Sequence, residues 1–174
     1  TNTTMKGHHR PRTGRGILAA AMLVAIAGPA VADVVTDVNA TAEQVVNSFG
    51  GSPGIQYALV HLAVYDAVNS IERRFETYAI TPSSPTGGAS KEAAAVAAAR
   101  AVLRALYPAP GAAAIYEAHY ATRLAAIPSG PSKDAGVALG EEVATKLLQM
   151  RANDGRAQIN APYVFKLPAA GVYQ

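Results

Sequence analysis

Apolar residues between Ile55 and Ile71 fall on every side of a helix and do not form a single stripe. A helix that is apolar all round is normally buried in the middle of other elements. Three polar residues, His61, Asp66 and Asn69, interrupt this apolar surface and need partners if they are buried. The pattern therefore predicts a central helix around which the rest of the domain is organised.

Four further helices are predicted from apolar spacing and from capping residues. The first follows a short extended segment at Val34 and Val35 and begins at a cap, either Asn39 or Thr41. The other three are expected over 91–107, capped by Ser90, over 111–127 and over 132–153. Proline, serine and glycine between residues 75 and 90 predict a loop that is longer than an ordinary connection.

Composition agrees with an all-α fold, a helical bundle of about five helices. Half of the residues are hydrophobic, but many of these are alanines, which favour helix and bury little area each. A chain of 174 residues has room for one domain with a real core. The sequence contains no cysteine, which excludes disulfides, thiol catalysis and cysteine-ligated metals.

The net charge of +3 belongs to the beginning of the chain. Lys6, Arg10, Arg12 and Arg15 precede the first apolar run, whereas all twelve acidic residues lie at or after Asp33. From that residue onward eleven basic side chains face twelve acidic ones, a balance of −1. A nucleic-acid partner is therefore not expected.

The first 32 residues contain a predicted secretory leader, Met5–Ala32. A basic segment precedes the apolar run ILAAAMLVAIA, and the small residues Ala30 and Ala32 flank Val31 directly before Asp33. The apolar run is short for a membrane span, so no stable span is expected once the leader is removed. We expect export to the periplasm or the medium with cleavage near Ala32–Asp33; an uncleaved anchor is the alternative.

Four polar residues of the central helix are the main candidates for chemistry. His61, Tyr65 and Asn69 are spaced by four and share a face, while Asp66 lies off that face. A functional interpretation makes His61 a base or ligand that Asp66 orients. A structural interpretation makes the four residues a buried polar seam, with Asp66 and Asn69 binding backbone amides of a loop. We favour the structural interpretation, because buried polar groups usually serve as hydrogen-bond partners.

Two other groups of polar residues give weaker signals. His119 and Glu117 are two positions apart and point to different sides of their helix, so a half-exposed surface histidine is expected. Glu141 and Glu142 are adjacent and cannot face each other like the carboxylates of a hydrolase, which predicts a solvated helix face. No catalytic, cofactor-binding or metal-binding residue is assigned to this chain.

Several segments together resemble one known family. They are LVHLAVYDAVNSIE, a loop with tyrosine followed by Pro-Ser-Ser-Pro, LGEEVA and MRANDGR, at Leu59–Glu72, Tyr78, Pro82–Pro85, Leu139–Ala144 and Met150–Arg156. The region from residue 33 to residue 174 resembles the N-terminal half of secreted bacterial vanadium-dependent haloperoxidase relatives in the type 2 phosphatidic-acid phosphatase superfamily. The resemblance implies a helical part over 33–156 and an irregular tail over 157–174 that leads into a C-terminal catalytic half.

The family's catalytic motifs are not found in this sequence. They are Lys-x6-Arg-Pro, Pro-Ser-Gly-His and Ser-Arg-x5-His, and the nearest match, Pro128-Ser129-Gly130, is followed by Pro131 and not by histidine. The resemblance therefore implies vanadate in the full-length protein and none bound by this chain, which we expect to be inactive alone.

Two functions are compatible with these observations. As the resemblance implies, the complete protein would be a haloperoxidase that oxidises halide with hydrogen peroxide, or a phosphatase that hydrolyses phosphomonoesters. This chain would then be its scaffold, with the C-terminal half as its partner and a second copy of the chain as a further candidate. The alternative is a non-enzymatic exported helical module that binds a protein partner.

Overall fold

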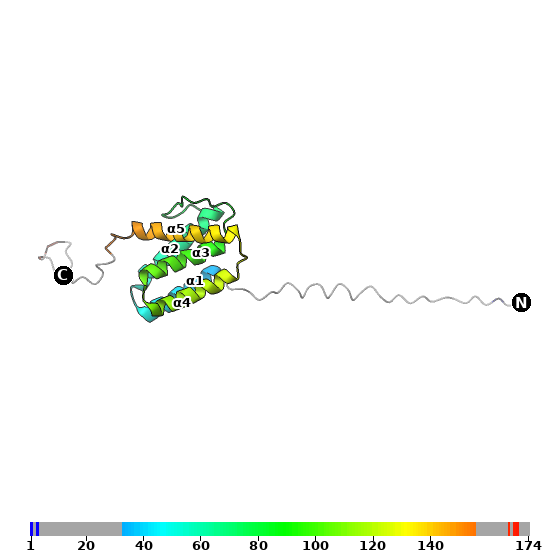
Figure 1. The fold of residues 1–174 in the computed structure, drawn as a ribbon, viewed down its shortest axis with the longest axis horizontal. Helices are drawn as coiled ribbons and strands as arrows, with labels where there is room; N and C mark the ends of the chain where they lie inside the picture. Colours follow the sequence, from blue (N-terminus) through cyan, green and yellow to red (C-terminus); the bar gives the residue numbers. More distant parts are fainter. Residues whose placement is uncertain (2, 4–32, 156–166, 168, 171–174) are drawn as a thin grey trace. The chain divides into compact units, whose positions relative to one another are not determined.

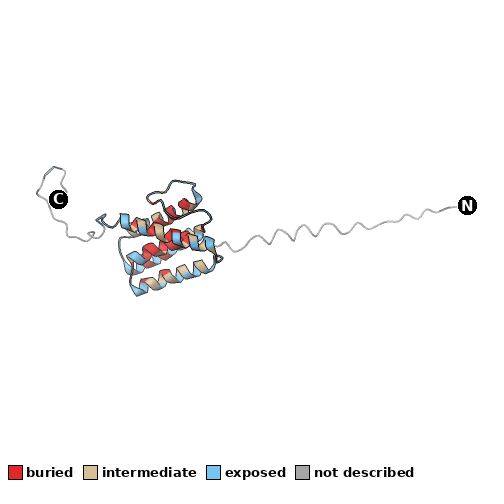
Figure 2. Ribbon diagram, turned by 45° about the horizontal axis from the view of Figure 1, so that its top comes forward, coloured by how far each residue is buried: buried red, intermediate tan, exposed pale blue. Residues whose placement is uncertain are grey.

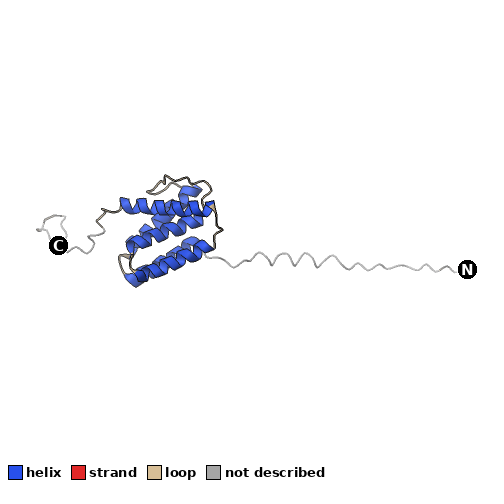
Figure 3. Cartoon of the chain, viewed as in Figure 1, coloured by secondary structure: helices blue, strands red, loops and turns tan. Residues whose placement is uncertain are grey.

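The computed structural model describes residues 33–155, together with residues 1, 3, 167, 169 and 170. Five α-helices make up the described part, which contains no strand, so the predicted all-α bundle is confirmed (Figures 1 and 3). The helices are α1 (Val34–Phe49), α2 (Pro53–Glu72), α3 (Lys91–Leu106), α4 (Pro110–Ala125) and α5 (Pro131–Met150). The predicted leader and most of the predicted tail lie outside the described residues. Among the described helices, none has the length and apolarity needed to cross a membrane.

The alanine-rich helix α3 lies at the centre of the bundle. It packs against all four other helices, with α5 along one side and α1 and α4 along the other (Figure 1). Every residue from Ala93 to Ala99 is buried, and Figure 2 shows the middle of the bundle in the colour of buried residues. In contrast, α2 keeps an exposed face, where Tyr65 is 42% exposed. The prediction that the helix over 55–71 is central is therefore wrong. Small side chains allow all four neighbouring helices to approach α3 closely, so its middle part is more completely buried than α2, which carries larger residues.

Two glycines bring α5 against α3. A Cβ atom at Gly140 would lie 2.3 Å from the carbonyl oxygen of Ala94 and 2.8 Å from the backbone nitrogen of Ala98. A Cβ atom at Gly136 would lie 2.4 Å from the carbonyl oxygen of Ser90. Because the two glycines are four residues apart, they share a face and let the backbones of α5 and α3 meet directly.

The helix α1 begins at Val34, so both the expected extended segment there and the expected cap at Asn39 or Thr41 are wrong. The hydroxyl of Thr41 donates to the carbonyl of Asp37, one turn earlier within the helix, at 2.9 Å. Val38 is buried in the core and Val34 packs against it. This burial on one helical face outweighs the weak local preference of valine for extended structure.

The residues that predicted where α2 and α3 begin have the expected capping roles in the structure. Pro53 occupies the first turn of α2, and the hydroxyl oxygen of Ser90 accepts the N–H of Ala93 at 3.2 Å. α2 ends because Arg73 adopts a left-handed backbone conformation with φ of 53° while its N–H donates to the carbonyl of Asn69. The predicted loop between the two helices is confirmed.

Candidate functional site

Asp66 anchors the loop between α2 and α3. Its side chain is fully buried, and its carboxylate accepts the backbone N–H groups of Tyr78 at 2.5 Å, Ala79 at 3.0 Å and Ile80 at 2.8 Å. Three such bonds compensate a carboxylate for its loss of water. Asp66 therefore has the loop-binding role that the structural interpretation gives it.

The other three residues of the proposed seam lie in different surroundings. A ring nitrogen of His61, Nε2, lies 3.0 Å from the side-chain oxygen of Asn39 and connects α2 to α1. Tyr65 is exposed, and its hydroxyl donates to a backbone carbonyl of the loop that follows α2. Asn69 is buried and borders a pocket. Because His61 bonds to α1 and Asp66 to the loop, these two residues do not form the acid–base pair of the functional interpretation.

Glu142 is a second anchor of the same loop, so the solvated helix face predicted at this position is wrong. Its carboxylate accepts the backbone N–H groups of Ser83 at 2.6 Å and Ser84 at 3.1 Å. Lys146 lies one turn later on α5 and forms an ion pair with Glu142 at 2.7 Å. The Lys146 ammonium and the hydrogen bonds from both serines hold the pKa of Glu142 at about 2, compared with its usual 4.5.

This lowered pKa predicts an acid-dependent loss of stability. The folded pKa lies below the unfolded value, so the contribution of Glu142 is complete above about 4.5 and disappears as the pH falls to about 2. We expect Glu142→Gln to lower the midpoint of thermal unfolding near neutral pH and to match the parent chain below pH 2. Glu43→Gln, at an exposed position of α1, should keep the parent profile. A constant difference between E142Q and the parent across this range would contradict the assignment.

The two ends of the loop are also joined. Glu72 at the end of α2 and Lys91 at the start of α3 form an ion pair. The segment from Arg73 to Ser90 is therefore closed at its neck and attached to α2 and α5 by two carboxylates. In Figure 1 it lies beside α5 at the edge of the bundle. A long loop that is fixed in this way is more typical of a functional element than of a simple linker.

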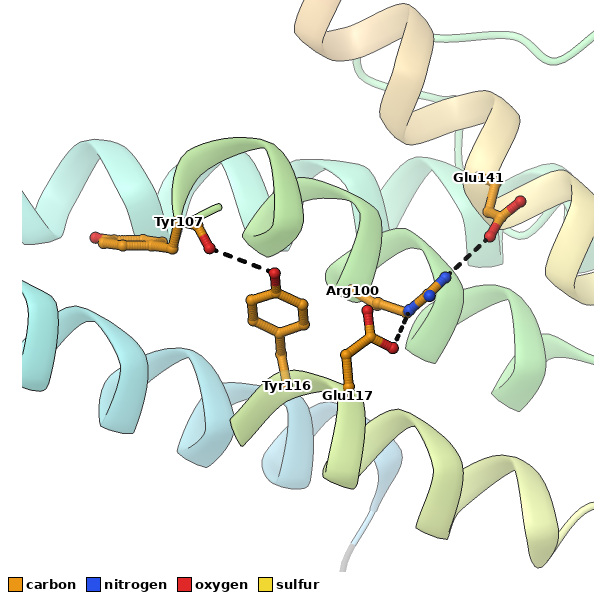
Figure 4. Close-up of polar contacts among 5 residues, drawn as sticks. All are labelled: Arg100, Tyr107, Tyr116, Glu117 and Glu141. Carbon is orange, nitrogen blue, oxygen red and sulfur yellow. Dashed lines mark hydrogen bonds and ion pairs between the residues drawn. The ribbon is translucent and has the colours of Figure 1, made fainter. Parts of the chain in front are cut away.

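A second group of charges connects three helices. Arg100 of α3 donates to Glu117 of α4 at 2.8 Å and to Glu141 of α5 at 3.3 Å (Figure 4). The guanidinium carbon also lies 4.3 Å from the centre of the Tyr120 ring. This arginine therefore links α4 and α5 through α3, in addition to the direct contact in which Lys133 of α5 donates to the Leu124 carbonyl of α4 at 2.6 Å. Glu141, like Glu142, is therefore engaged and not simply solvated.

A tyrosine pair and a histidine complete the polar groups near α4. The hydroxyl of Tyr116 donates to the carbonyl of Tyr107 at 3.3 Å (Figure 4). His119 is half-buried, and its Nε2 atom is buried without a hydrogen-bond partner in the described structure. Burial lowers the pKa of His119, which lies near the ion pair between Asp37 and Arg123. The tyrosine contact contributes to packing between helices. His119 has no hydrogen-bonded partner at Nε2 that would make it one of a catalytic pair in the described structure.

Local sequence patterns could reveal only part of these contacts. Glu142 and Lys146 are four residues apart, a spacing typical of a helical ion pair, but the Ser83 amide lies 59 positions away. No periodicity indicates which loop a helical carboxylate will bind. Within the described residues, no group of three or more histidines and acidic side chains could hold a metal ion.

The comparisons with known proteins give no identification. No family model matches this chain, and neither a curated protein nor a solved structure does.

Proposed function

We propose that this chain is the N-terminal scaffold of an exported vanadium-dependent haloperoxidase-like enzyme. One observation carries the proposal: segments that carry the family resemblance meet at a single loop. Asp66, from the first segment, binds the amides of Tyr78 and its neighbours, and Glu142, from LGEEVA, binds those of Ser83 and Ser84. If these distant segments together hold one structural unit, the family would keep the same residues in each of them.

The chemistry of these residues supports a scaffold role. A carboxylate that accepts three backbone N–H groups has most of its lone pairs occupied, and it is poorly placed to move a proton to or from a substrate. The resemblance segments thus contribute anchors, and the reaction is assigned to residues beyond this chain. The complete enzyme would oxidise halide with hydrogen peroxide on bound vanadate, or hydrolyse a phosphomonoester at the equivalent site.

Two observations support the assignment of vanadate to residues outside this chain. A multiply charged oxyanion needs several cations and amides that converge on it. Arg100 is already paired with two glutamates. Arg73 borders a pocket between the end of α2 and the following loop, and it is the one charged side chain in the lining of that pocket. We therefore assign vanadate to residues of the C-terminal half.

The reading frame beyond residue 174 tests the proposal directly. We expect it to encode Pro-Ser-Gly-His and a later Ser-Arg with a downstream histidine. The purified extended chain should oxidise bromide or hydrolyse p-nitrophenyl phosphate, and the present chain should do neither with vanadate supplied. A stop codon soon after Gln174 would favour the exported module that binds a protein partner, and turnover by the present chain would place the catalytic site within it.

Export belongs to the same proposal and has its own test. If Met5–Ala32 is a cleaved leader, N-terminal sequencing of the protein secreted by a bacterial host should begin at Asp33. Retention of the intact N-terminus on the secreted or membrane-bound product would contradict cleavage at this position.

A further inference from the structure

We propose that the pocket between the end of α2 and the following loop binds a small hydroxylated carboxylate, such as a sugar acid. This inference is independent of the function proposed above, because it depends only on side chains present in this chain. The pocket has a volume of about 330 Å³, which lies within the range typical of small-molecule sites.

The pocket is held in shape before any ligand binds. Its outer wall is the loop from Arg73 to Ser90, which the Glu72–Lys91 ion pair closes at the neck. Asp66 and Glu142 fix this wall to α2 and α5 through five backbone amides. A ligand therefore has little loop to order when it binds, and this lowers the entropic cost of association.

Arg73 supplies the charge that would recognise an anion. It is the one charged residue of the lining, and it forms no ion pair with a carboxylate in the part of the chain that the structure describes. One guanidinium nitrogen donates to the hydroxyl of Thr86, which also lines the pocket, at 3.3 Å. Arginine has five N–H donors, so most of them stay available to a ligand.

Further hydroxyl groups line the same pocket. The Oγ1 atoms of Thr77 and Thr81 lie 3.3 Å apart, and each hydroxyl can accept further bonds while one of the two keeps a free proton. Asn69 adds an amide at the pocket wall, and Phe75 provides an apolar surface. Groups that both donate and accept, beside an apolar wall, suit the alternating hydroxyls and C–H faces of a polyol.

The electrostatics favour a monoanion over phosphate. The lining contains one cation and no acidic side chain. The pocket also lies at the C-terminal end of α2, where the negative end of the helix dipole opposes any anion and opposes a dianion more strongly than a monoanion. The planar fork of arginine matches a carboxylate, which it can bind through two parallel bonds.

The test is a titration of the isotope-labelled chain followed by amide chemical shifts in nuclear magnetic resonance. The probes are gluconate, neutral glucose and inorganic phosphate. We expect gluconate to shift the amides of Asn69, Arg73 and Thr86, with glucose and phosphate each at least tenfold weaker. Arg73→Gln should weaken gluconate binding at least tenfold. Arg104→Gln is the matched control, because Arg104 is exposed on α3 and is not part of the lining.

A further variant separates recognition from folding. Thr86→Val removes one hydroxyl at nearly constant volume. It should weaken gluconate binding while the free chain keeps its folded spectrum, with shift changes confined to residues near Thr86 and its hydrogen-bond partner Arg73. The proposal is overturned if gluconate causes no localised shifts, if glucose or phosphate binds as well as gluconate, or if R104Q weakens binding as much as R73Q.

Discussion

Replacing Gly140 by alanine will destabilise the bundle by about 2–3 kcal/mol, although alanine is the better helix former. The added Cβ would lie 2.3 Å from the carbonyl oxygen of Ala94 and 2.8 Å from the nitrogen of Ala98. Both atoms belong to the backbone of the central helix, so they cannot rotate away as a side chain would. α5 must then move off α3, and the buried contacts between them are lost. Urea unfolding followed by circular dichroism measures the change.

Gly54 provides the matched control for this substitution. It also lies within a helix, α2, but a Cβ atom there would meet nothing within 4 Å. Gly54→Ala should therefore be neutral or stabilising by up to about 1 kcal/mol. If G140A proved as stable as G54A, the direct contact between α3 and α5 would not be present in solution.

Replacing Asp66 by asparagine will cost about 2–3 kcal/mol and release the loop from α2. The side-chain amide offers one acceptor oxygen where the carboxylate offers two. Its NH₂ group would face either the N–H of Tyr78 or those of both Ala79 and Ile80. Buried donors are then left without partners in the interior. Hydrogen exchange should accelerate at Tyr78, Ala79 and Ile80, and urea unfolding should show the loss of stability.

Asp134→Asn is the control for loss of one carboxylate. Asp134 is exposed in the first turn of α5, where its interaction with the helix dipole contributes only about 0.3–1 kcal/mol. Its substitution should leave the exchange of the loop amides unchanged. If D66N left those amides equally protected, Asp66 would not be the anchor of the loop.

Those parts of the fold that depend on neighbours in sequence were predictable. Ser90 indicates the start of α3 because its hydroxyl can accept the backbone N–H of the residue three positions later. Pro53 indicates the start of α2 because the first turn of a helix does not need the N–H that proline lacks. The loop between α2 and α3 follows from prolines and glycines that cannot continue a helix. Such signals are complete within a few residues, so no tertiary contact is needed to read them.

Of the two carboxylates that anchor the loop, only Asp66 could be predicted from the sequence. Asp66 stands out because an apolar helix cannot bury a carboxylate without partners, and this leads directly to an anchoring role. Glu142 gives no comparable signal, since an exposed glutamate before Lys146 looks the same whether or not a loop docks on it. The pocket beside Arg73 is lined mainly by the loop that both anchors hold, and nothing near Arg73 in the sequence indicates this.

Local sequence patterns were enough to predict a bundle of helices, where most of those helices begin, and that Asp66 needs partners. Which helix is central depends on tertiary packing. The pattern of apolar residues favours α2 as the central helix, because large side chains dominate that pattern and alanine and glycine contribute little to it. The close packing of Gly136 and Gly140 against α3 depends on the absence of side-chain volume. A missing side chain affects packing only when a second backbone occupies the space that it leaves, and a local sequence pattern does not show this.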